Sequence, residues 1–180
     1  MKSLLGKLGV ILVGLAIFSY AEAWADEEER RTLRGLKGVY VSIADLTPES
    51  GEIGLTQDQL RTDVELRLRK AGIKVLTQQD FYSAKGKPYL LISVGCKKGE
   101  VGTRVGNRVY PYKFYALSMM VFLYQNVLLE RSPNINVSGA TWTGASFGWS
   151  SKDNMRNFIK NGLGDIVERF MNDYLAENQK

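Results

Sequence analysis

The strongest restriction on the fold comes from residues 153–175, near the C-terminal end of the chain. Their apolar side chains recur at intervals of three and four residues, which predicts one long helix with a single apolar face. These side chains are Met155, Phe158, Ile159, Leu163, Ile166, Val167, Phe170, Met171, Tyr174 and Leu175. Ser151 is the expected N-cap. Gly162 and Gly164 each cost about 1 kcal/mol relative to alanine, and we expect them to let the helix lie close to a sheet.

Alternation of apolar and polar residues predicts the strands of that sheet. The predicted strands are residues 36–46, 73–76, 88–97, 110–131 and 137–149. A helix is the alternative for residues 110–131, but their Tyr, Phe and Val content favours a strand, bent or bulged near Ser118. The glycine-rich residues 98–108 are predicted as a hairpin turn, and Pro133 with Asn134 and Asn136 as a second turn.

A second helix is predicted between the first two strands. Thr56 and Gln59 form a T-x-x-Q capping box at its start, and Gly72 is its expected stop. Its inner stripe consists of Leu60, Val64 and Leu68. Residues 47–54 and 77–87 are predicted as loops. The order β-α-β-β-β-β-α predicts an α+β fold, with one antiparallel or mixed sheet of about five strands and two helices on one face.

The N-terminal residues have the pattern of a secretory signal peptide. Two lysines precede an apolar run of eleven residues, Leu8 to Phe18, and alanines follow at alternate positions. A membrane-spanning helix needs about 20 apolar residues. We therefore expect cleavage after Ala25, with Ala23 as the second choice and an uncleaved N-terminal anchor as the alternative.

This pattern predicts an exported, periplasmic protein without a stable membrane anchor after cleavage. Lipid attachment is not expected, since no cysteine lies near the leader. The predicted parts are a signal peptide (1–25), a disordered mature N-terminus (26–35) and a single α+β domain (36–178).

Charge and cysteine content narrow the classes of partner and chemistry. The net charge of +5 is mild. Outside the cytoplasm it argues against nucleic acid and is compatible with lipid headgroups or an anionic glycan. Cys96 is the single cysteine, so no internal disulfide can form. Its place in an apolar strand pattern predicts a small buried residue.

The amino-acid composition gives little support for catalysis or for metal binding. The chain contains no histidine, which removes the commonest general base and metal ligand. Zinc bound by Cys and His is excluded with one cysteine. We predict no catalytic residues, no metal and no cofactor. The alternative is a glycan hydrolase that uses carboxylates among Asp45, Glu49 and Glu52.

The two faces of the predicted sheet differ in character. The helix-covered face is predicted to contain Val39, Val41, Ile43, Leu90, Ile92, Val94, Leu117, Met119, Val121 and Leu123. The opposite face is predicted to contain Tyr40, Ser42, Tyr89, Ser93, Tyr112, Phe114, Ser118, Phe122 and Tyr124. Its mixture of aromatic and serine side chains is typical of a recognition surface. The predicted binding residues are Tyr40, Tyr89, Tyr112, Phe114, Phe122 and Tyr124.

The segment "GLTQDQLRTDVELRLRKAGIKVL", followed by "PYLLISV" and a long strand, resembles a recurring envelope module. Similar layouts occur in the N-terminal domain of the Tol-system periplasmic propeller protein, in the curli-secretion lipoprotein family, and in auxiliary proteins of lipopolysaccharide and lipid transport. The C-terminal "FMNDYLAENQ" resembles an exported bacterial family of unassigned function. The resemblance implies a binding or assembly role without catalysis and transfers no functional residue.

The leading hypothesis is therefore a non-catalytic periplasmic binding or assembly module. It would bind an envelope protein or a second copy of itself through the aromatic face and the edge of the long hairpin, with an anchor such as Phe114 or Tyr124. The alternative is a carrier of an apolar or lipid ligand. That hypothesis predicts a cavity between the sheet and the C-terminal helix, lined by Met119, Met155 and Phe170.

Overall fold

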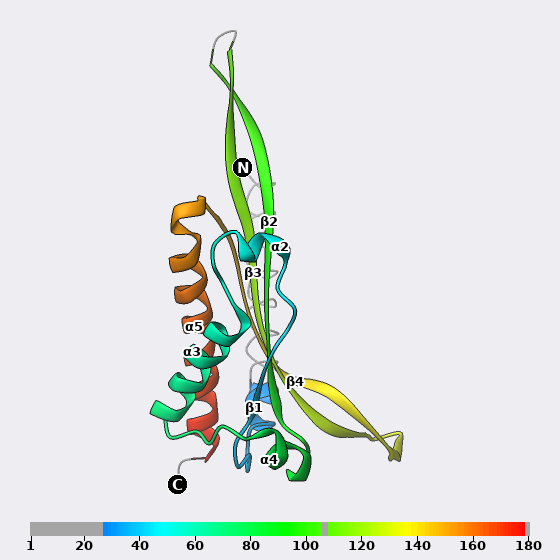
Figure 1. The fold of residues 1–180 in the computed structure, drawn as a ribbon. Coiled ribbons are helices and arrows are strands. Elements are labelled where there is room, and N and C mark those ends of the chain that lie inside the picture. The colour runs from blue at the N-terminus through cyan, green and yellow to red at the C-terminus, as the bar shows by residue number, and fades with distance from the viewer. Residues whose placement is uncertain (1–26, 106–107, 179–180) are drawn as a thin grey trace, which may run out of the picture.

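The computed structural model describes residues 27–105 and 108–178, in which four strands form one mixed sheet (Figure 1). The strands are β1 (Tyr40–Ile43), β2 (Tyr89–Val105), β3 (Arg108–Leu129) and β4 (Ser132–Ser150). They lie side by side in the order β1-β2-β3-β4. β1 is parallel to β2, and the other two pairs are antiparallel. The predicted α+β class is confirmed.

The sheet has four strands instead of about five, because residues 73–76 do not join it. Their one strand-like contact is a parallel bridge between Val39 and Val75. The N–H of Val39 donates to the Lys74 carbonyl at 3.0 Å, and the N–H of Leu76 donates to the Val39 carbonyl at 2.9 Å. Thr77 then caps the next helix, so the segment ends before a ladder can grow.

Helices α3 (Gln57–Lys70) and α5 (Lys152–Asn178) cover one face of the sheet, as predicted (Figure 1). α3 lies against β1, and α5 lies against β3 and β4. Both helices pack their apolar stripes against the sheet, because this contact removes the apolar surfaces of both helix and sheet from water. Phe170 and Trp142 are the largest fully buried side chains, and the Trp142 indole N–H donates to Asp173 at 2.9 Å.

The ends of α3 follow their capping residues. The Thr56 hydroxyl accepts from the Gln59 N–H at 3.2 Å. The Gln59 side chain does not complete the predicted box, because it accepts from Arg156 of α5 at 3.4 Å. Gly72 adopts φ +77°, and the N–H of Ile73 returns to the Leu68 carbonyl at 2.9 Å, which confirms the predicted stop.

Two short helices replace predicted loops. α2 (Pro48–Gly51) begins with a proline, whose fixed φ suits the first helical turn. α4 (Gln78–Ser83) has a complete capping box. The Thr77 hydroxyl accepts from the Asp80 N–H at 3.1 Å, and the Asp80 carboxylate accepts from the Thr77 N–H at 3.4 Å. The T-x-x-D pattern was the signal for this helix.

The N-terminal segment also differs from its prediction as disordered. Residues 27–31 form a helical turn, and Leu33 is fully buried in the core. The Arg34 guanidinium donates to Glu177 of α5 at 2.8 Å. Arg30 also pairs with Glu177, at 3.4 Å, so a buried leucine and two ion pairs hold the segment against the end of α5. The predicted signal peptide and its cleavage site lie outside the described residues.

Two hairpins extend beyond the body of the sheet (Figure 1). We call residues 99–105 and 108–114 the β2–β3 arm, because β4 ends where Ser150 pairs with Tyr115. We call residues 125–129 and 132–139 the β3–β4 arm, because β2 begins where Tyr89 pairs with Tyr124.

These arms correct three local predictions. Most of the glycine-rich stretch 98–108 lies within strands, and the Phe114 ring covers Gly99 across the ladder. The irregular register occurs at Leu123/Tyr124 and Leu128/Leu129, not at Ser118. Pro133 lies inside β4 instead of in the turn, as an edge strand tolerates a residue without an N–H.

Candidate functional site

The candidate site is the open face of the sheet, opposite α3 and α5. Burial separates the two faces as the alternation predicted. The ten residues predicted for the covered face are all buried. Of the six predicted binding residues, Tyr112 is 47% exposed and the others are half-buried. The structure thus places all six on the open face, and their binding role stays a prediction.

Four of these six residues belong to one aromatic cluster, at the end of the open face next to α4. The cluster consists of Tyr40, Phe81, Tyr89, Phe122 and Tyr124. Tyr89 and Tyr124 stack with ring centres 5.2 Å apart. Phe81 of α4 lies 5.3 Å from Tyr40 and 5.9 Å from Tyr89. Since these rings contact one another, the cluster fastens α4 to the sheet and has a structural role of its own.

The other two predicted residues lie on the β2–β3 arm. Phe114 is opposite Gly99 and is half-buried by covering it. Tyr112 projects further out, beside Tyr110, which is 51% exposed. The arm lacks a third strand, so these rings have few neighbours to contact.

Sequence reasoning missed two residues of β4 that are more exposed than any of the six. Phe147 and Trp149 are 65% and 67% exposed on the open face. Their cross-strand neighbours are Ser118 and Ala116, which are too small to cover a large ring. The alternation of small and large residues in "TGASFGW", residues 143–149, is the sequence signal for this exposure. We call Tyr110, Tyr112, Phe114, Phe147 and Trp149 the aromatic strip.

The open face carries no acidic residue along the paired part of β2, β3 and β4. The register places the odd-numbered residues 89–101, the even-numbered residues 108–124 and the odd-numbered residues 143–149 on this face. Lys97 and Arg108 are the charged residues among them. The face therefore suits a neutral or anionic partner better than a cationic one.

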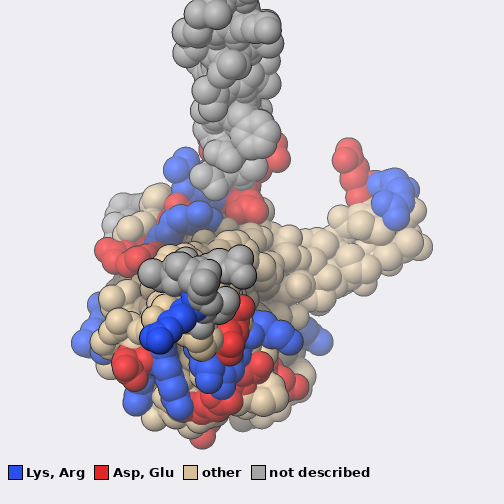
Figure 2. Space-filling view, turned by 90° about the horizontal axis from the view of Figure 1, so that it is seen from above, with Lys and Arg blue, Asp and Glu red and all other residues tan. Residues whose placement is uncertain are grey.

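The β3–β4 arm is an uncharged projection with Glu130 and Arg131 at its end (Figure 2). It exposes Leu128, Ile135 and Val137. An isolated two-stranded hairpin is at best marginally stable in water. Ile135 and Val137 lie on one face of this arm, and Leu128 lies on the other, because Leu128 pairs with Asn136.

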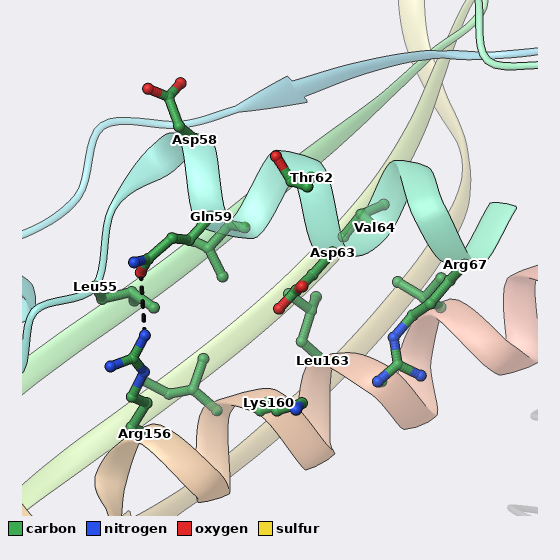
Figure 3. A pocket seen from close by; sticks show the side chains of 14 residues that line it. Leu55, Asp58, Gln59, Thr62, Asp63, Val64, Arg67, Arg156, Lys160 and Leu163 are labelled. Atoms are coloured by element: carbon green, nitrogen blue, oxygen red, sulfur yellow. Dashed lines mark hydrogen bonds between the residues drawn. The ribbon is translucent and has the colours of Figure 1, made fainter. Parts of the chain in front are cut away.

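A recess of about 490 Å³ lies between α3 and α5 (Figure 3). Its floor is apolar and includes Leu60, Val64 and Leu163. Its rim carries both signs of charge and is crossed by the hydrogen bond from Arg156 to Gln59. Neither this recess nor a smaller one beside β4 is lined by the residues predicted for a lipid cavity, Met119, Met155 and Phe170. These three side chains are fully buried in the core.

The three candidate carboxylates have different surroundings. The Tyr115 hydroxyl donates to Glu52 at 3.1 Å, and Lys98 lies 3.9 Å from the same carboxylate. Burial, followed by this contact with Glu52, raises the pKa of Tyr115. Asp45 accepts from the Gln57 amide at 3.4 Å. Neither recess is lined by Asp45, Glu49 or Glu52.

Cys96 is buried, as predicted, with its Sγ 3.7 Å from the sulfur of Met155. Burial, and after it the negative charges of Glu49 and Glu52, raise the pKa of the thiol. Within the described ranges, no three His, Cys, Asp or Glu side chains gather as a metal site. In the same ranges, no helix is both long and apolar enough to cross a membrane.

No family model matches the chain, and no curated protein matches it. Among solved structures, the chain is similar to a minor lipoprotein from Acinetobacter baumannii, at 9% sequence identity and a TM-score of 0.32. The alignment covers 78% of this chain and 95% of that chain. At this identity and score the likeness transfers no site residue.

Proposed function

We propose that the chain is a non-catalytic binding module of the bacterial envelope, and that it binds an envelope protein through the aromatic strip. The observation that carries the proposal is the exposure of Phe147 and Trp149, at 65% and 67%, on the same face of the sheet as the exposed Tyr110 and Tyr112 of the β2–β3 arm. Exposed apolar patches of this kind mark interaction sites, because burying them on a partner removes apolar surface from water.

The envelope location is supported by the signal-peptide pattern of residues 1–25. The basic start, the short apolar run and the alternating alanines are the three parts of such a leader. We propose that the mature protein lies in the periplasm after cleavage near Ala25. A module there meets other exported proteins, so its partner is an envelope protein.

The absence of catalysis is supported by the residue chemistry. The sequence has no histidine. Cys96 is buried with a raised thiol pKa, so it is a poor nucleophile. Glu52 accepts a hydrogen bond from Tyr115, and neither recess is lined by a candidate carboxylate. These observations favour recognition over reaction.

The structure changes which residues we propose as anchors. Tyr124 stacks on Tyr89, and Phe114 covers Gly99, so both rings already stabilise the fold. Trp149 and Tyr112 are more exposed, at 67% and 47%, whereas Phe114 and Tyr124 are half-buried. Since large aromatic side chains dominate binding energy at interface centres, we propose Trp149 and Tyr112 as the main anchors.

Site-specific photocrosslinking in intact cells tests this proposal. A photoreactive residue at position 112 or 149 is expected to capture the same envelope protein. Position 66 on α3 is the matched control, because Leu66 is also an exposed apolar residue, at 48%. Crosslinks of equal yield from position 66, or none from positions 112 and 149, would overturn the proposed site.

Alanine variants then separate binding from folding. Trp149→Ala should weaken binding of the captured partner by at least about tenfold, which corresponds to roughly 1.4 kcal/mol. Its melting temperature should stay close to that of the unchanged protein. Tyr124→Ala should lower the melting temperature instead, because it removes a stacked ring. A loss of stability in Trp149→Ala equal to that in Tyr124→Ala would place Trp149 in the structural core.

A further inference from the structure

The free edge of the sheet at β4 lacks the usual protection against strand pairing. β4 is an outer strand of 19 residues with no charged side chain. Natural edge strands are commonly short or carry lysine, proline or a covering segment. β1, at the other edge, is only four residues long. The single proline of β4, Pro133, lies in the β3–β4 arm, far from the aromatic strip.

Side-chain contacts show which backbone groups of β4 point outward. The N–H of Thr143 donates to the Glu29 carboxylate at 3.1 Å, and the Thr143 carbonyl accepts from Arg169. Backbone groups of an antiparallel strand alternate between its two sides. The register from Thr143 to Ser150 contains no bulge. The N–H and C=O groups of Ala145, Phe147 and Trp149 therefore also point away from β3.

Among residues 27–105 and 108–178, none fills the space beside this stretch of edge. A shallow recess of about 240 Å³ runs between it and α5, and Ala145 and Gly162 are among its lining residues. The side chains of Phe147 and Trp149 are about two-thirds exposed. Glu29 and Thr32 contact the edge further along, at Thr143 and Thr141. Residues 145–149 thus combine outward backbone groups with room for another strand.

We propose that β4 pairs antiparallel with β4 of a second copy of this chain, about a twofold axis at Phe147. The axis places Phe147 opposite Phe147 of the second copy. It also places each Trp149 opposite Ala145 of the other copy, so a large ring meets a small side chain. Since β4 has no charged residue, the self-pairing brings no like charges opposite one another along the two strands. An interface of this kind is closed by its own symmetry.

The exposed area sets the expected strength. An aromatic side chain buries about 150–250 Å² when fully covered, so each two-thirds-exposed ring offers about 130 Å². Four rings in the dimer therefore offer about 500 Å², below the roughly 1,200 Å² of a standard stable interface. Backbone pairing and the flanks of α5 must supply the remainder. We therefore expect a dissociation constant on the order of micromolar.

Such a dimer joins two sheets into one and places both aromatic strips on the same face. The inference does not depend on the partner proposed above, because purified protein alone should form the dimer. Failure of one proposal therefore leaves the other standing. A dimer without a crosslinked envelope protein would reject the proposed function, and the reverse result would reject the strand pairing.

Sedimentation velocity of the purified exported protein, at about 1 to 100 μM, tests the inference. We expect a monomer–dimer equilibrium across this range. Phe147→Lys should shift the dissociation constant at least about tenfold upward, because it places like charges on the twofold axis. Leu66→Lys, a charge at an exposed site on α3, is the matched control and should leave the equilibrium unchanged. A monomer at every concentration would overturn the inference.

Ala145→Pro distinguishes edge pairing from stacking of the open faces. It removes an outward N–H and leaves both aromatic side chains and the ladder to β3 in place. Edge pairing predicts that this variant is monomeric with an unchanged circular-dichroism spectrum. A variant that dimerises like the unchanged protein would overturn the strand pairing in favour of face-to-face contact. If Ala145→Pro does not fold, two other measurements replace it. Edge pairing predicts that folded Phe147→Lys is monomeric and that the Phe147 amide of the unchanged protein is protected from hydrogen exchange in the dimer. An unprotected Phe147 amide in the dimer would overturn the strand pairing.

Discussion

Replacing Gly144 by alanine tests how closely α5 approaches the sheet. Gly144 lies on the covered face of β4, directly beneath Ile166 of α5. A Cβ at this position would lie well under 3.0 Å from Ile166 Cγ2 and 2.9 Å from Trp142 Cη2. Neither neighbour is free to move away, because Ile166 is buried and Trp142 is fully enclosed in the core. Gly144→Ala therefore forces the helix or the indole to shift.

Two opposing effects set the magnitude. Overpacking by one methyl group in a filled core costs about 1–3 kcal/mol. Alanine recovers about 0.5–1 kcal/mol, because glycine loses more conformational freedom on folding. The net expectation is a loss of about 1–2 kcal/mol in the free energy of unfolding. For a domain of this size that lowers the melting temperature by roughly 2–8 °C.

A double-mutant cycle with Ile166→Ala identifies the cause. Ile166→Ala alone should cost about 2–5 kcal/mol through the cavity that it leaves. In that background the alanine at position 144 meets no Cγ2, so its penalty should largely disappear. The expected coupling is about 1–2 kcal/mol, measured by urea unfolding followed by circular dichroism. Gly139→Ala in the same strand is the control, since the nearest neighbours of its added Cβ belong to Val127 of β3, at 3.1 Å, and not to α5. An undiminished penalty in the Ile166→Ala background would refute the reasoning.

Two further predictions concern titrating groups. The Cys96 thiol, whose pKa is raised by burial and then by Glu49 and Glu52, should react with a thiol reagent at pH 8 only after unfolding; rapid labelling of the native protein would contradict its burial. The hydrogen bond from Arg34 holds the pKa of Glu177 below its ordinary range. A depressed carboxyl pKa stabilises the fold above the ordinary value of about 4.3 and loses this effect as pH falls through the lower native value. Melting temperature should therefore fall less steeply below pH 4 in Glu177→Gln, and identical pH profiles would show that the ion pair contributes nothing.

Local periodicity was sufficient for most of the fold. The spacing of apolar residues located α3 and α5, since each helix repeats its buried positions every three or four residues. The alternation along β2 and β3 assigned Val94 and Met119 to the covered face and Tyr89 and Phe122 to the open face. These predictions were confirmed because the direction of a side chain follows the period of its own helix or strand, so the pattern of apolar residues along one element shows which face is buried.

Local reasoning failed where a distant contact decides the conformation. Gly99 reads as a turn residue, but Phe114 covers it and the strand continues. Residues 27–35 read as a solvated tail, but Leu33 reaches the core and Arg34 meets Glu177. Residues 73–76 read as a strand, but the capped helix after Thr77 ends their pairing. In each case the residue that decides the conformation lies outside the segment whose pattern was interpreted, either elsewhere in the fold or in the cap of the next helix.

The sequence by itself determined the class of fold, the helix-covered core and the aromatic character of the open face. Only the tertiary structure decided which aromatic side chains are accessible. Tyr124 is partly enclosed because Tyr89 stacks on it across the ladder. Trp149 is exposed because Ala116 lies opposite, and because β4 is the outer strand of the sheet in the described part of the chain. The exposure of a side chain depends on its neighbours in space. Strand order and register determine those neighbours, whereas the pattern of residues along one strand does not.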